Sequence, residues 1–301
     1  MLLIIDIMKS GIIAVIGRPN VGKSTLLNRL IGEKLTIVSP RPQTTWQRLH
    51  GILTTEDAQF VFIDTPGLET DKNSQFISAL KKTTLSAVND ADIILHIVEP
   101  FIADKEKYII DELKKLKDKP KMLLINKIDL KKDKQILLPV TDWYADLAMY
   151  SDIIPISAIT GDGIDILLHE LKKYLPTEGM LYSEDTITDK YEKELAAEII
   201  REKMFYSTRD EVPYSAVCVV DRFDESQRDR IIRIYATIYV EKASQRGIVI
   251  GSHGSMIKKI GTSARIDMEK LLGTKVYLEL YVKVRKNWKK DKTFLKEIGL
   301  K

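Results

Sequence analysis

The sequence predicts an α/β domain with a mostly parallel sheet and helices on both faces, followed by a smaller α+β domain. Up to residue 175, short and nearly unbroken apolar runs alternate with amphipathic segments, as expected when parallel strands are buried on both faces. Beyond residue 188 the pattern changes to helix, two strands, two helices and one strand. The length of 301 residues fits two domains of roughly 150 residues each.

The first domain is placed at residues 9–175. Apolar runs predict its strands at 12–16, 60–63, 93–98, 122–125 and 153–156. Amphipathic segments predict its helices at 23–31, 74–89, 105–117 and 164–174. In such a sheet the ligand crevice lies at the carboxyl ends of the strands. The residues that follow each strand are therefore the candidates for a site.

A polar linker is expected at residues 176–188, because Pro176 ends the preceding helix and a polar stretch follows. The second domain, with a basic tail, is placed at 189–301. Its expected elements are a helix at 189–205, strands at 215–221 and 231–240, a helical segment at 255–272 and a strand at 274–285.

Composition excludes several classes of protein. The chain is 44% hydrophobic, which excludes wholesale disorder, and its one cysteine excludes a disulfide framework and a cysteine-based zinc site. That residue, Cys218, lies in an apolar strand and is assigned to packing. No apolar run approaches the ~20 residues that span a bilayer, so we expect a soluble, cytoplasmic protein. The histidines His50, His96 and His169 have no spacing typical of a metal site.

Charge is divided unevenly along the chain. Residues 1–180 carry 23 basic and 24 acidic side chains, whereas the segment from Lys242 onward carries 15 basic and 5 acidic ones. A basic second half indicates contact with a polyanion, either nucleic acid or a membrane surface. A solvated basic face is the alternative that charge alone leaves open.

A phosphate-binding pattern, G-x-x-x-x-G-K-[ST], follows the first predicted strand and opens a helix. Gly17 and Gly22 let backbone N–H groups face a phosphate chain. Lys23 would reach the β- and γ-phosphates and Ser24 would bind Mg²⁺. The expected nucleotide-binding residues here are Gly17, Arg18, Pro19, Asn20, Val21, Gly22, Lys23, Ser24 and Thr25.

A second candidate segment, Asp64-Thr65-Pro66-Gly67, follows the strand at 60–63. Asp64 at a strand end can hold Mg²⁺ through water, and the N–H of Gly67 can approach a γ-phosphate. D-x-x-G alone is a common turn, but after the phosphate-binding loop it favours a nucleotide site.

Two further segments indicate that the base is guanine. In Asn126-Lys127-Ile128-Asp129, the Asp129 carboxylate can accept two parallel hydrogen bonds from guanine, a pair that adenine does not offer. Asn126 would contact the base edge and brace the phosphate-binding loop, while the stem of Lys127 covers a base face. Ser157-Ala158 would offer a backbone N–H to guanine O6.

These four motifs resemble the GTPase superfamily over residues 9–175. The resemblance implies an α/β P-loop GTPase domain that binds GTP and GDP, is specific for guanine and depends on Mg²⁺. The family's mobile-loop threonine is matched by Gln43-Thr44-Thr45, in which Thr45 would close onto Mg²⁺ while a γ-phosphate is present. The implied metal ligands are Ser24, Thr45 and Asp64, and the implied catalytic residues are Lys23, Thr45, Gly67 and Asn20.

Two positions refine the expected catalysis. Leu68 stands where many GTPases have a water-positioning glutamine, so unaided hydrolysis should be slow. Related GTPases that lack this glutamine often carry an asparagine at the position of Asn20, and some bind K⁺ there. Asn20 is therefore a candidate K⁺ ligand, with a role as a turn residue as the alternative.

A G-x-x-G segment between apolar stretches stands in the second domain and resembles a KH domain of the bacterial type, type II, over residues ~205–285. Such a loop lets a nucleic-acid backbone approach closely, and the module grips about four nucleotides of single strand. Ile248, Val249 and Ile250 are candidate apolar walls. The implied RNA-binding residues are Ile250, Gly251, Ser252, His253, Gly254, Lys258 and Lys259.

The basic tail around Trp288 has two interpretations. It could reach phosphates or lie on an anionic membrane surface. Alternatively, Trp288 packs a terminal helix onto the module.

The combination resembles the bacterial Era family over nearly the whole chain. Further signs are Tyr182-Ser183-Glu184-Asp185 and Ile199-Ile200-Arg201-Glu202-Lys203. The resemblance implies binding near the 3′ end of small-subunit ribosomal RNA, a role in small-subunit assembly and peripheral membrane association. Trp46 departs from the family, which usually has a basic residue there, and the stretch before Lys9 exceeds what the family needs.

We therefore expect a monomeric, GTP-gated RNA-binding factor for ribosome assembly, in which GTP repositions the two domains. One alternative is a membrane-recruited signalling switch whose basic tail binds anionic lipid. Another is an RNA-binding protein with a structural nucleotide that does not switch.

Overall fold

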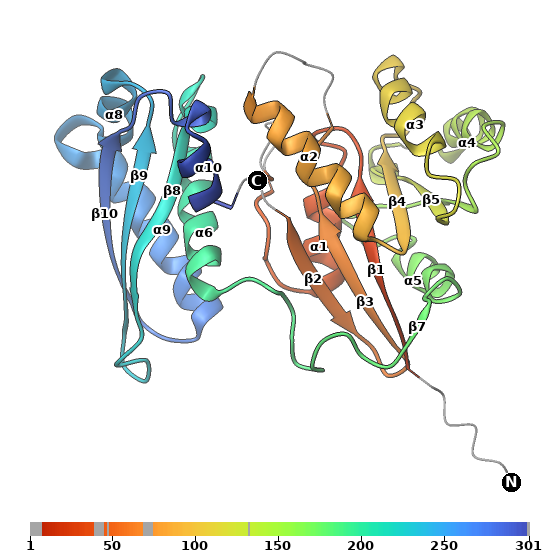
Figure 1. Cartoon of the computed structure of the whole chain (residues 1–301), viewed down its shortest axis with the longest axis horizontal. Helices are drawn as coiled ribbons and strands as arrows, with labels where there is room; N and C mark the ends of the chain where they lie inside the picture. The colour runs from red at the N-terminus through yellow and green to blue at the C-terminus, as the bar shows by residue number, and fades with distance from the viewer. Residues whose placement is uncertain (1–7, 39–44, 47, 69–74, 132, 300–301) are drawn as a thin grey trace, which may run out of the picture. The chain divides into compact units, whose positions relative to one another are not determined.

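The structure is a computed structural model, and it describes residues 8–38, 45–46, 48–68, 75–131 and 133–299. The chain divides into two compact units, one made of most residues up to Asp189 and the other of those from Lys190 on (Figure 1). Each unit has its own sheet and its own apolar core. No helix in the described ranges is both long and apolar enough to cross a membrane.

The first unit is built on a mostly parallel sheet. Its strands are β1 (Lys9–Ile16), β2 (Leu49–Thr54), β3 (Ala58–Asp64), β4 (Ile93–Val98), β5 (Lys121–Ile125), β6 (Asp152–Pro155) and β7 (Thr177–Glu178). They lie in the order β2-β3-β1-β4-β5-β6, and β7 pairs with β1. Among the strands of the described residues, the pairs β2–β3 and β1–β7 are antiparallel and the others in this sheet are parallel. The carboxyl ends of β1, β3, β4, β5 and β6 therefore share one edge.

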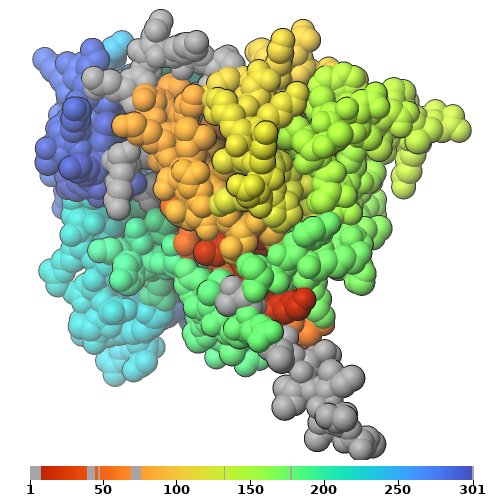
Figure 2. Space-filling view, turned by 45° about the vertical axis from the view of Figure 1, so that its right-hand side comes forward, coloured from red at the N-terminus to blue at the C-terminus, as the bar shows by residue number. Residues whose placement is uncertain are grey.

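Helices cover both faces of this sheet. They are α1 (Lys23–Ile31), α2 (Gln75–Asp90), α3 (Lys107–Lys114), α4 (Leu137–Ala145) and α5 (Ile164–Lys172), with 3₁₀ turns at Asp104–Glu106, Ile128–Leu130 and Lys134–Ile136. Ala14 and Ile16 of β1 pack with Val88 of α2 and Ile109 of α3, whereas α1 lies across the sheet from α2 (Figure 1). In Figure 2 the orange to light green helices form a continuous outer layer that leaves little of β1 visible.

The second unit contains the predicted order of helix, two strands, two helices and strand, with the short helices α7 and α10 added before the first strand and after the last one. Its elements are α6 (Glu192–Ser207), α7 (Val212–Ser215), β8 (Ala216–Asp224), β9 (Ile232–Val240), α8 (Ala243–Ile250), α9 (Ser255–Leu272), β10 (Val276–Val284) and α10 (Lys292–Glu297), with 3₁₀ turns at Ser252–Gly254 and Trp288–Lys290. The sheet order is β10-β9-β8, with β9 parallel to β10 and antiparallel to β8.

The core of the second unit follows from sequence periodicity. Alternate residues of β9, from Ile232 to Val240, are buried on one face of the sheet. Ile260, Ala264 and Met268, spaced by four on α9, pack against them. Cys218 is buried in the same core, as predicted, and burial raises the pKa of its thiol well above the usual range.

Some features of the first unit were not predicted. The edge strand β2 and the helix α4 had no expected counterpart. The segment 176–188, expected to be a linker, is held along the first unit. The side-chain oxygen of Gln59 accepts hydrogen bonds from the backbone N–H groups of Leu181 and Tyr182, at 2.8 and 2.9 Å, and the N–H of Ile52 donates to the carbonyl of Ile187 at 2.9 Å.

Candidate functional site

The phosphate-binding loop connects β1 to α1, as the sequence predicted. Its backbone takes positive φ angles at Gly17 (154°), Asn20 (64°) and Gly22 (106°). A Cβ atom at Gly17 would lie 2.4 Å from the carbonyl oxygen of Ile97, and one at Gly22 would lie 2.2 Å from Asn126 Nδ2. Both positions therefore require glycine on steric grounds as well as conformational ones.

Lys23 curls back over this loop. Its Nζ donates to the carbonyl oxygens of Gly17 at 3.1 Å and of Arg18 at 2.9 Å, and its side chain is almost fully buried. Because the first N–H groups of α1 have no partner within the helix, they carry partial positive charge. The buried ammonium adds a full charge, so the loop is suited to bind phosphate.

Three oxygen atoms from separate segments meet beside the loop. Ser24 Oγ donates to Asp64 Oδ2 at 2.9 Å, Thr45 Oγ1 donates to the same oxygen at 3.1 Å, and the two hydroxyl oxygens are 3.1 Å apart. These are the three residues that the sequence assigned to a metal ion. Gln43 and Thr44, the other residues of that predicted loop motif, lie outside the described residues.

The residues at this point fit Mg²⁺. Hydroxyl and carboxylate oxygens are its preferred protein ligands, and it commonly keeps several waters. Asp64 is fully buried, and its Oδ1 has no hydrogen-bond partner among the described groups. Burial raises the pKa of Asp64, although Lys23 and the two hydroxyl groups oppose this. A buried carboxylate with an unused oxygen is stabilised when a cation or its bound water faces it.

The segment after β3 packs against the phosphate-binding loop. The hydroxyl of the buried Thr65 donates to the Val15 carbonyl at 2.7 Å. A Cβ atom at Gly67 would lie 2.8 Å from the backbone N of Pro19. The backbone of Gly67 is therefore too close to the loop for any residue with a side chain. The next side chain, Leu68, is 7% exposed and packs in the core with Ile16 and Val88.

The predicted base-binding residues also meet at the carboxyl edge of the sheet. The buried Asn126 donates from Nδ2 to the Val21 carbonyl at 2.8 Å, and its Oδ1 accepts from the N–H of Ala158 at 2.9 Å. This is the predicted brace on the phosphate-binding loop. Asp129 is exposed, and its Oδ1 accepts a hydrogen bond from Ser157 Oγ at 2.7 Å. That bond orients the carboxylate and leaves its second oxygen available.

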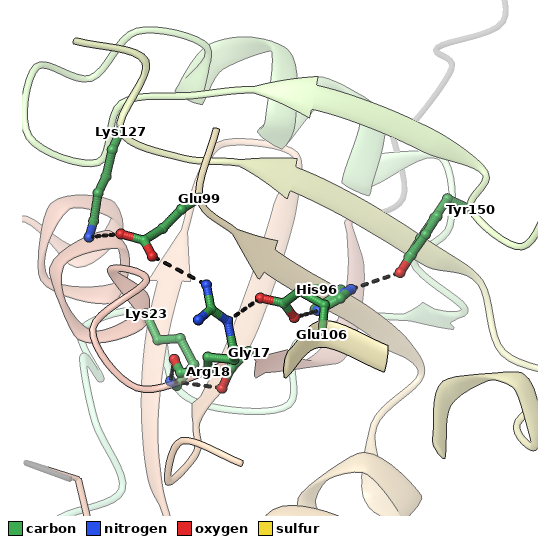
Figure 3. Close-up of polar contacts among 8 residues, drawn as sticks. All are labelled: Gly17, Arg18, Lys23, His96, Glu99, Glu106, Lys127 and Tyr150. Carbon is green, nitrogen blue, oxygen red and sulfur yellow. Dashed lines mark hydrogen bonds and ion pairs between the residues drawn. The ribbon is translucent and has the colours of Figure 1, made fainter. Parts of the chain in front are cut away.

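Sequence reasoning missed the acidic side chains that hold Arg18 and Lys127. Glu99 contacts both residues, and Glu106 contacts Arg18 (Figure 3). Glu99 could have been found, because it directly follows the strand β4 at the edge where the motifs gather. Glu106 carried no such signal. The guanidinium of Arg29, also missed, donates to the carbonyl oxygen of Ala158 at 3.3 Å.

The G-x-x-G loop of the second unit connects α8 to α9. Gly251, His253 and Gly254 have φ angles of 73°, 49° and 75°. A Cβ atom at Gly251 would lie 2.7 Å from Met256 Cβ, whereas one at Gly254 would meet nothing closer than 3.9 Å. Gly251 is thus needed for the loop to form, whereas the space beside Gly254 is open.

Polar and basic side chains surround this open backbone. Ser252 and His253 are exposed in the loop, and Lys258 and Lys259 are exposed on the first turns of α9. The N-terminus of this helix of 18 residues adds partial positive charge at Gly254. An exposed backbone beside basic groups is suited to bind the phosphates of a single strand.

One prediction for the apolar walls beside the G-x-x-G loop was wrong. Val249, proposed as an apolar wall, is fully buried in the core, and only its neighbour Ile248 is exposed, while Ile250 is partly buried. These three residues are consecutive on the helix α8, where each turn of 3.6 residues places neighbouring side chains on different faces.

Trp288 is fully buried, its Nε1 donates to the Ser215 carbonyl at 3.0 Å, and its ring packs against Phe294 of α10. The packing interpretation of Trp288 is therefore correct.

Family models match both units. A model described as 50S ribosome-binding GTPase matches residues 12–127, and a KH domain model matches residues 211–289. Among curated proteins, GTPase Era of Syntrophus aciditrophicus is 48% identical over 293 residues, which cover 97% of this chain and 95% of that protein. GTPase Era of Geobacter metallireducens is 47% identical over 293 residues and covers 97% of each chain.

Solved structures give the same result. A crystal structure of Era in complex with MgGDPNP and nucleotides 1506–1542 of 16S ribosomal RNA matches with a TM-score of 0.93 and 35% identity, covering 97% of this chain and 99% of that one. An Aquifex aeolicus Era variant bound to GDP·AlF₄⁻ matches with the same TM-score, identity and coverage.

Proposed function

The chain belongs to the Era family of GTPases, and we propose that it is a GTP-controlled RNA-binding factor in small ribosomal subunit assembly. The observation that carries the nucleotide part is the meeting of Ser24, Thr45 and Asp64 within 3.1 Å of one another beside the phosphate-binding loop. The exposed G-x-x-G loop supports the RNA part.

In this proposal the first unit binds GTP and GDP at the carboxyl edge of its sheet. The backbone N–H groups of residues 17–25, apart from Pro19, which has none, and the ammonium of Lys23 bind the phosphates. The N–H of Gly67 binds the γ-phosphate. Asp129 recognises guanine with Ser157 and Ala158, while Asn126 holds the loop. Ser24, Thr45 and Asp64 would hold Mg²⁺, which stabilises negative charge on the phosphates. A relative carries MgGDPNP in its crystal structure, which supports this assignment.

Hydrolysis by these residues alone is proposed to be slow. Leu68 offers no polar group to orient water, and its side chain packs in the core. Asn20 is the proposed ligand of K⁺, which would place positive charge beside the phosphates. The test is the hydrolysis rate in K⁺ and in Na⁺ at equal ionic strength. Equal rates for the wild type and Asn20→Asp would remove this role.

The second unit is proposed to bind single-stranded RNA at the 3′ end of small-subunit ribosomal RNA. The RNA contacts are assigned to the backbone of Gly251–Gly254, the side chains of Ser252 and His253, Ile250 beside the loop, and the ammonium groups of Lys258 and Lys259. The 16S fragment in the Era crystal structure directs this proposal to the small subunit, although the family model's description names the 50S particle.

The experiment measures the coupling between the two ligands. A labelled RNA with the 3′-terminal sequence of 16S ribosomal RNA is titrated into the full chain with GDPNP, with GDP and without nucleotide. We expect the tightest binding with GDPNP. By linkage, the same RNA must tighten GDPNP binding by the same factor. Equal RNA affinity in all three states would exclude GTP control while leaving RNA binding in place.

Variants of the loop separate RNA binding from folding. Gly254→Asp adds a negative side chain where space is open, at a left-handed conformation that aspartate tolerates, so we expect RNA affinity to fall at least tenfold. Lys258→Glu should weaken RNA binding and lower its salt dependence. Lys270→Glu, at the exposed far end of the same helix, is the matched control. RNA affinity unchanged by Gly254→Asp and Lys258→Glu would remove the assigned RNA site.

A peripheral contact with an anionic membrane is the second candidate, supported by the exposed Lys283 and Lys286. The burial of Trp288 removes the aromatic anchor that such a contact would use. Gly254→Asp separates the two binding activities, because it should lower RNA affinity at least tenfold and spare binding to vesicles. We further propose that the chain acts as a cytoplasmic monomer.

A further inference from the structure

Glu99 lies between two nucleotide-binding segments that are far apart in the sequence. In the sheet, β4 lies between β1 and β5. Arg18 is two residues beyond the end of β1, Lys127 is two residues beyond the end of β5, and Glu99 directly follows the last residue of β4. The topology therefore places one carboxylate between the phosphate-binding loop and the lysine assigned to the base (Figure 3).

The carboxylate uses both of its oxygens. Glu99 Oε1 accepts a hydrogen bond from Lys127 Nζ at 2.6 Å, and Oε2 accepts one from Arg18 Nη2 at 3.3 Å. The three side chains are 17–27% exposed, with Lys127 the most exposed at 27%. Ion pairs shielded to this degree are screened less than pairs at an open surface. Lys127 also has a positive φ of 66°, so its backbone is held in an unusual conformation where the side chain begins.

Arg18 is held from the opposite side by a buried chain of polar groups. Its Nε donates to Glu106 Oε1 at 2.5 Å, Glu106 Oε2 lies 3.3 Å from His96 Nε2, and His96 Nδ1 lies 2.7 Å from the hydroxyl of Tyr150. His96 and Glu106 are at most 1% exposed. Burial raises the pKa of Tyr150, so the hydroxyl keeps its proton and can donate to His96. Arg18 is thus anchored in the core, and it provides a fixed partner for Glu99.

We propose that Glu99 is a positioning residue for guanine nucleotide binding, which holds the Lys127 side chain in place over the base and ties it to the phosphate-binding loop. This role deepens the nucleotide site proposed above and rests on it. A free lysine side chain loses considerable rotamer freedom when it is fixed against a ligand. Anchoring its ammonium before the nucleotide arrives lowers that cost of binding.

The experiment measures dissociation of a fluorescent GDP analogue from the full chain. Glu99→Gln keeps the size of the side chain and removes its charge. Its amide has one acceptor oxygen in place of two, so one of the two hydrogen bonds is lost and the other is weakened. We expect dissociation to be about tenfold faster, equivalent to ~1.4 kcal/mol. The KM for GTP should rise by a similar factor, with kcat changed less than twofold. Glu112→Gln removes a carboxylate of α3 that pairs with Lys115 at 3.0 Å and with Lys81 at 3.8 Å, and as the matched control it should change neither value.

A double-mutant cycle tests whether Glu99 acts through Lys127. Lys127→Met keeps the apolar stem and removes the ammonium. In that background Glu99→Gln should change dissociation less than twofold. A tenfold effect that persists in this background would overturn the proposal, and so would a fall in kcat with dissociation and KM unchanged.

Further measurements separate the role of Glu99 from a folding defect and from a failure of the proposed nucleotide site. A single cooperative thermal unfolding transition without nucleotide should show that Glu99→Gln folds. If that variant does not fold, Glu99→Asp keeps the charge, shortens the reach to Lys127 and should also speed dissociation, whereas unchanged dissociation would overturn the proposal. A wild-type chain that does not bind the GDP analogue would remove the proposed nucleotide site. A wild type that binds it no more tightly than the Glu99 variants would remove only the role of Glu99.

Discussion

Asn126 and Val21 are 105 positions apart in the sequence, and the Asn126 Nδ2 donates a hydrogen bond of 2.8 Å to the Val21 carbonyl. The other end of the same amide accepts from the N–H of Ala158 at 2.9 Å. One buried side chain thus joins the phosphate-binding loop, the end of β5 and the segment after β6. Gly22 is the residue that leaves room for this amide, because a Cβ atom there would lie 2.2 Å from it.

Asn126→Ala should weaken both folding and nucleotide binding. The substitution leaves a buried carbonyl and a buried N–H without partners, and each such group costs about 1–3 kcal/mol. We expect the free energy of unfolding to fall by about 2–4 kcal/mol and GDP to dissociate faster. Urea unfolding and release of a fluorescent GDP analogue measure the two effects. Asn89→Ala, at an exposed position near the end of α2, should leave both unchanged. A normal stability for Asn126→Ala would contradict the bracing role.

Asp129→Asn should change the base that the site prefers. The carboxylate can accept from both guanine N1–H and the exocyclic amine, whereas a carboxamide presents one acceptor and one donor. Xanthine carries an oxygen in place of that amine, so the variant should prefer XDP to GDP. Competition of GDP and XDP against a fluorescent analogue measures this preference. If Asp129→Asn still favours GDP as the wild type does, the base is recognised by other groups.

Leu68→Gln should not create a faster GTPase. The side chain of Leu68 is 7% exposed and packs with Ile16 and Val88, so glutamine there would bury an unpaired amide. A buried polar group of this kind costs about 1–3 kcal/mol. We expect that loss of stability and no increase in hydrolysis rate, measured as phosphate release at saturating GTP. An accelerated rate would indicate that the side chain at this position turns toward the γ-phosphate.

Most of the fold and much of the site could be predicted, because their signals are local. The helix from Lys23 to Ile31 is bounded by a glycine at each end, and α9 has the predicted span of 255–272. The site motifs follow their strands directly. Parallel pairing then brings the ends of β1, β3, β5 and β6 to one edge without further information.

The features that sequence reasoning missed depend on tertiary contacts. The strand β2 is short and contains Gly51, where a Cβ atom would lie 2.7 Å from Leu27 Cδ1 of α1. Glycine lowers the propensity of a segment to form a strand. The presence of Gly51 here is explained only by the close approach of α1. The helix α4 contains Pro139, which is tolerated because it lies in the first turn. Likewise, the burial of the polar Gln59 is explained only by the backbone N–H groups of Leu181 and Tyr182, which donate hydrogen bonds to its side-chain oxygen.

Trp288→Ala should destabilise the second unit strongly. The indole is fully buried, packs against Phe294 and donates to the Ser215 carbonyl at 3.0 Å. Truncating a buried tryptophan costs about 3–5 kcal/mol. Trp143→Ala is the control, because that side chain is 36% exposed and should cost much less. Urea unfolding of the full chain measures both. Similar losses for the two variants would contradict the packing role of Trp288.

The lowered pKa of Glu106 predicts that the free energy of unfolding decreases at acidic pH. Burial alone would raise the pKa of this carboxyl, but the hydrogen bonds from His96 and Arg18 outweigh it and hold the pKa below the usual value of 4.5. A group with a lowered pKa in the folded state contributes stability above its unfolded pKa, and that contribution is lost as the pH falls through the folded pKa. The contribution of Glu106 should therefore be complete at pH 7 and decrease only below about pH 4.5.

Glu106→Gln isolates this contribution. At pH 7 the variant loses the charge that pairs with Arg18, and we expect a fall in the free energy of unfolding of about 2 kcal/mol, within the range for breaking well-shielded charged hydrogen bonds. As the pH falls below about 4.5, protonation of Glu106 makes the wild type resemble the variant, so the difference between them should shrink. Urea unfolding at several pH values between 7 and 3.5 measures it, with Glu112→Gln as the control. A difference that stays constant, or grows, as the pH falls would mean that the carboxylate of Glu106 does not hold Arg18 through its charge.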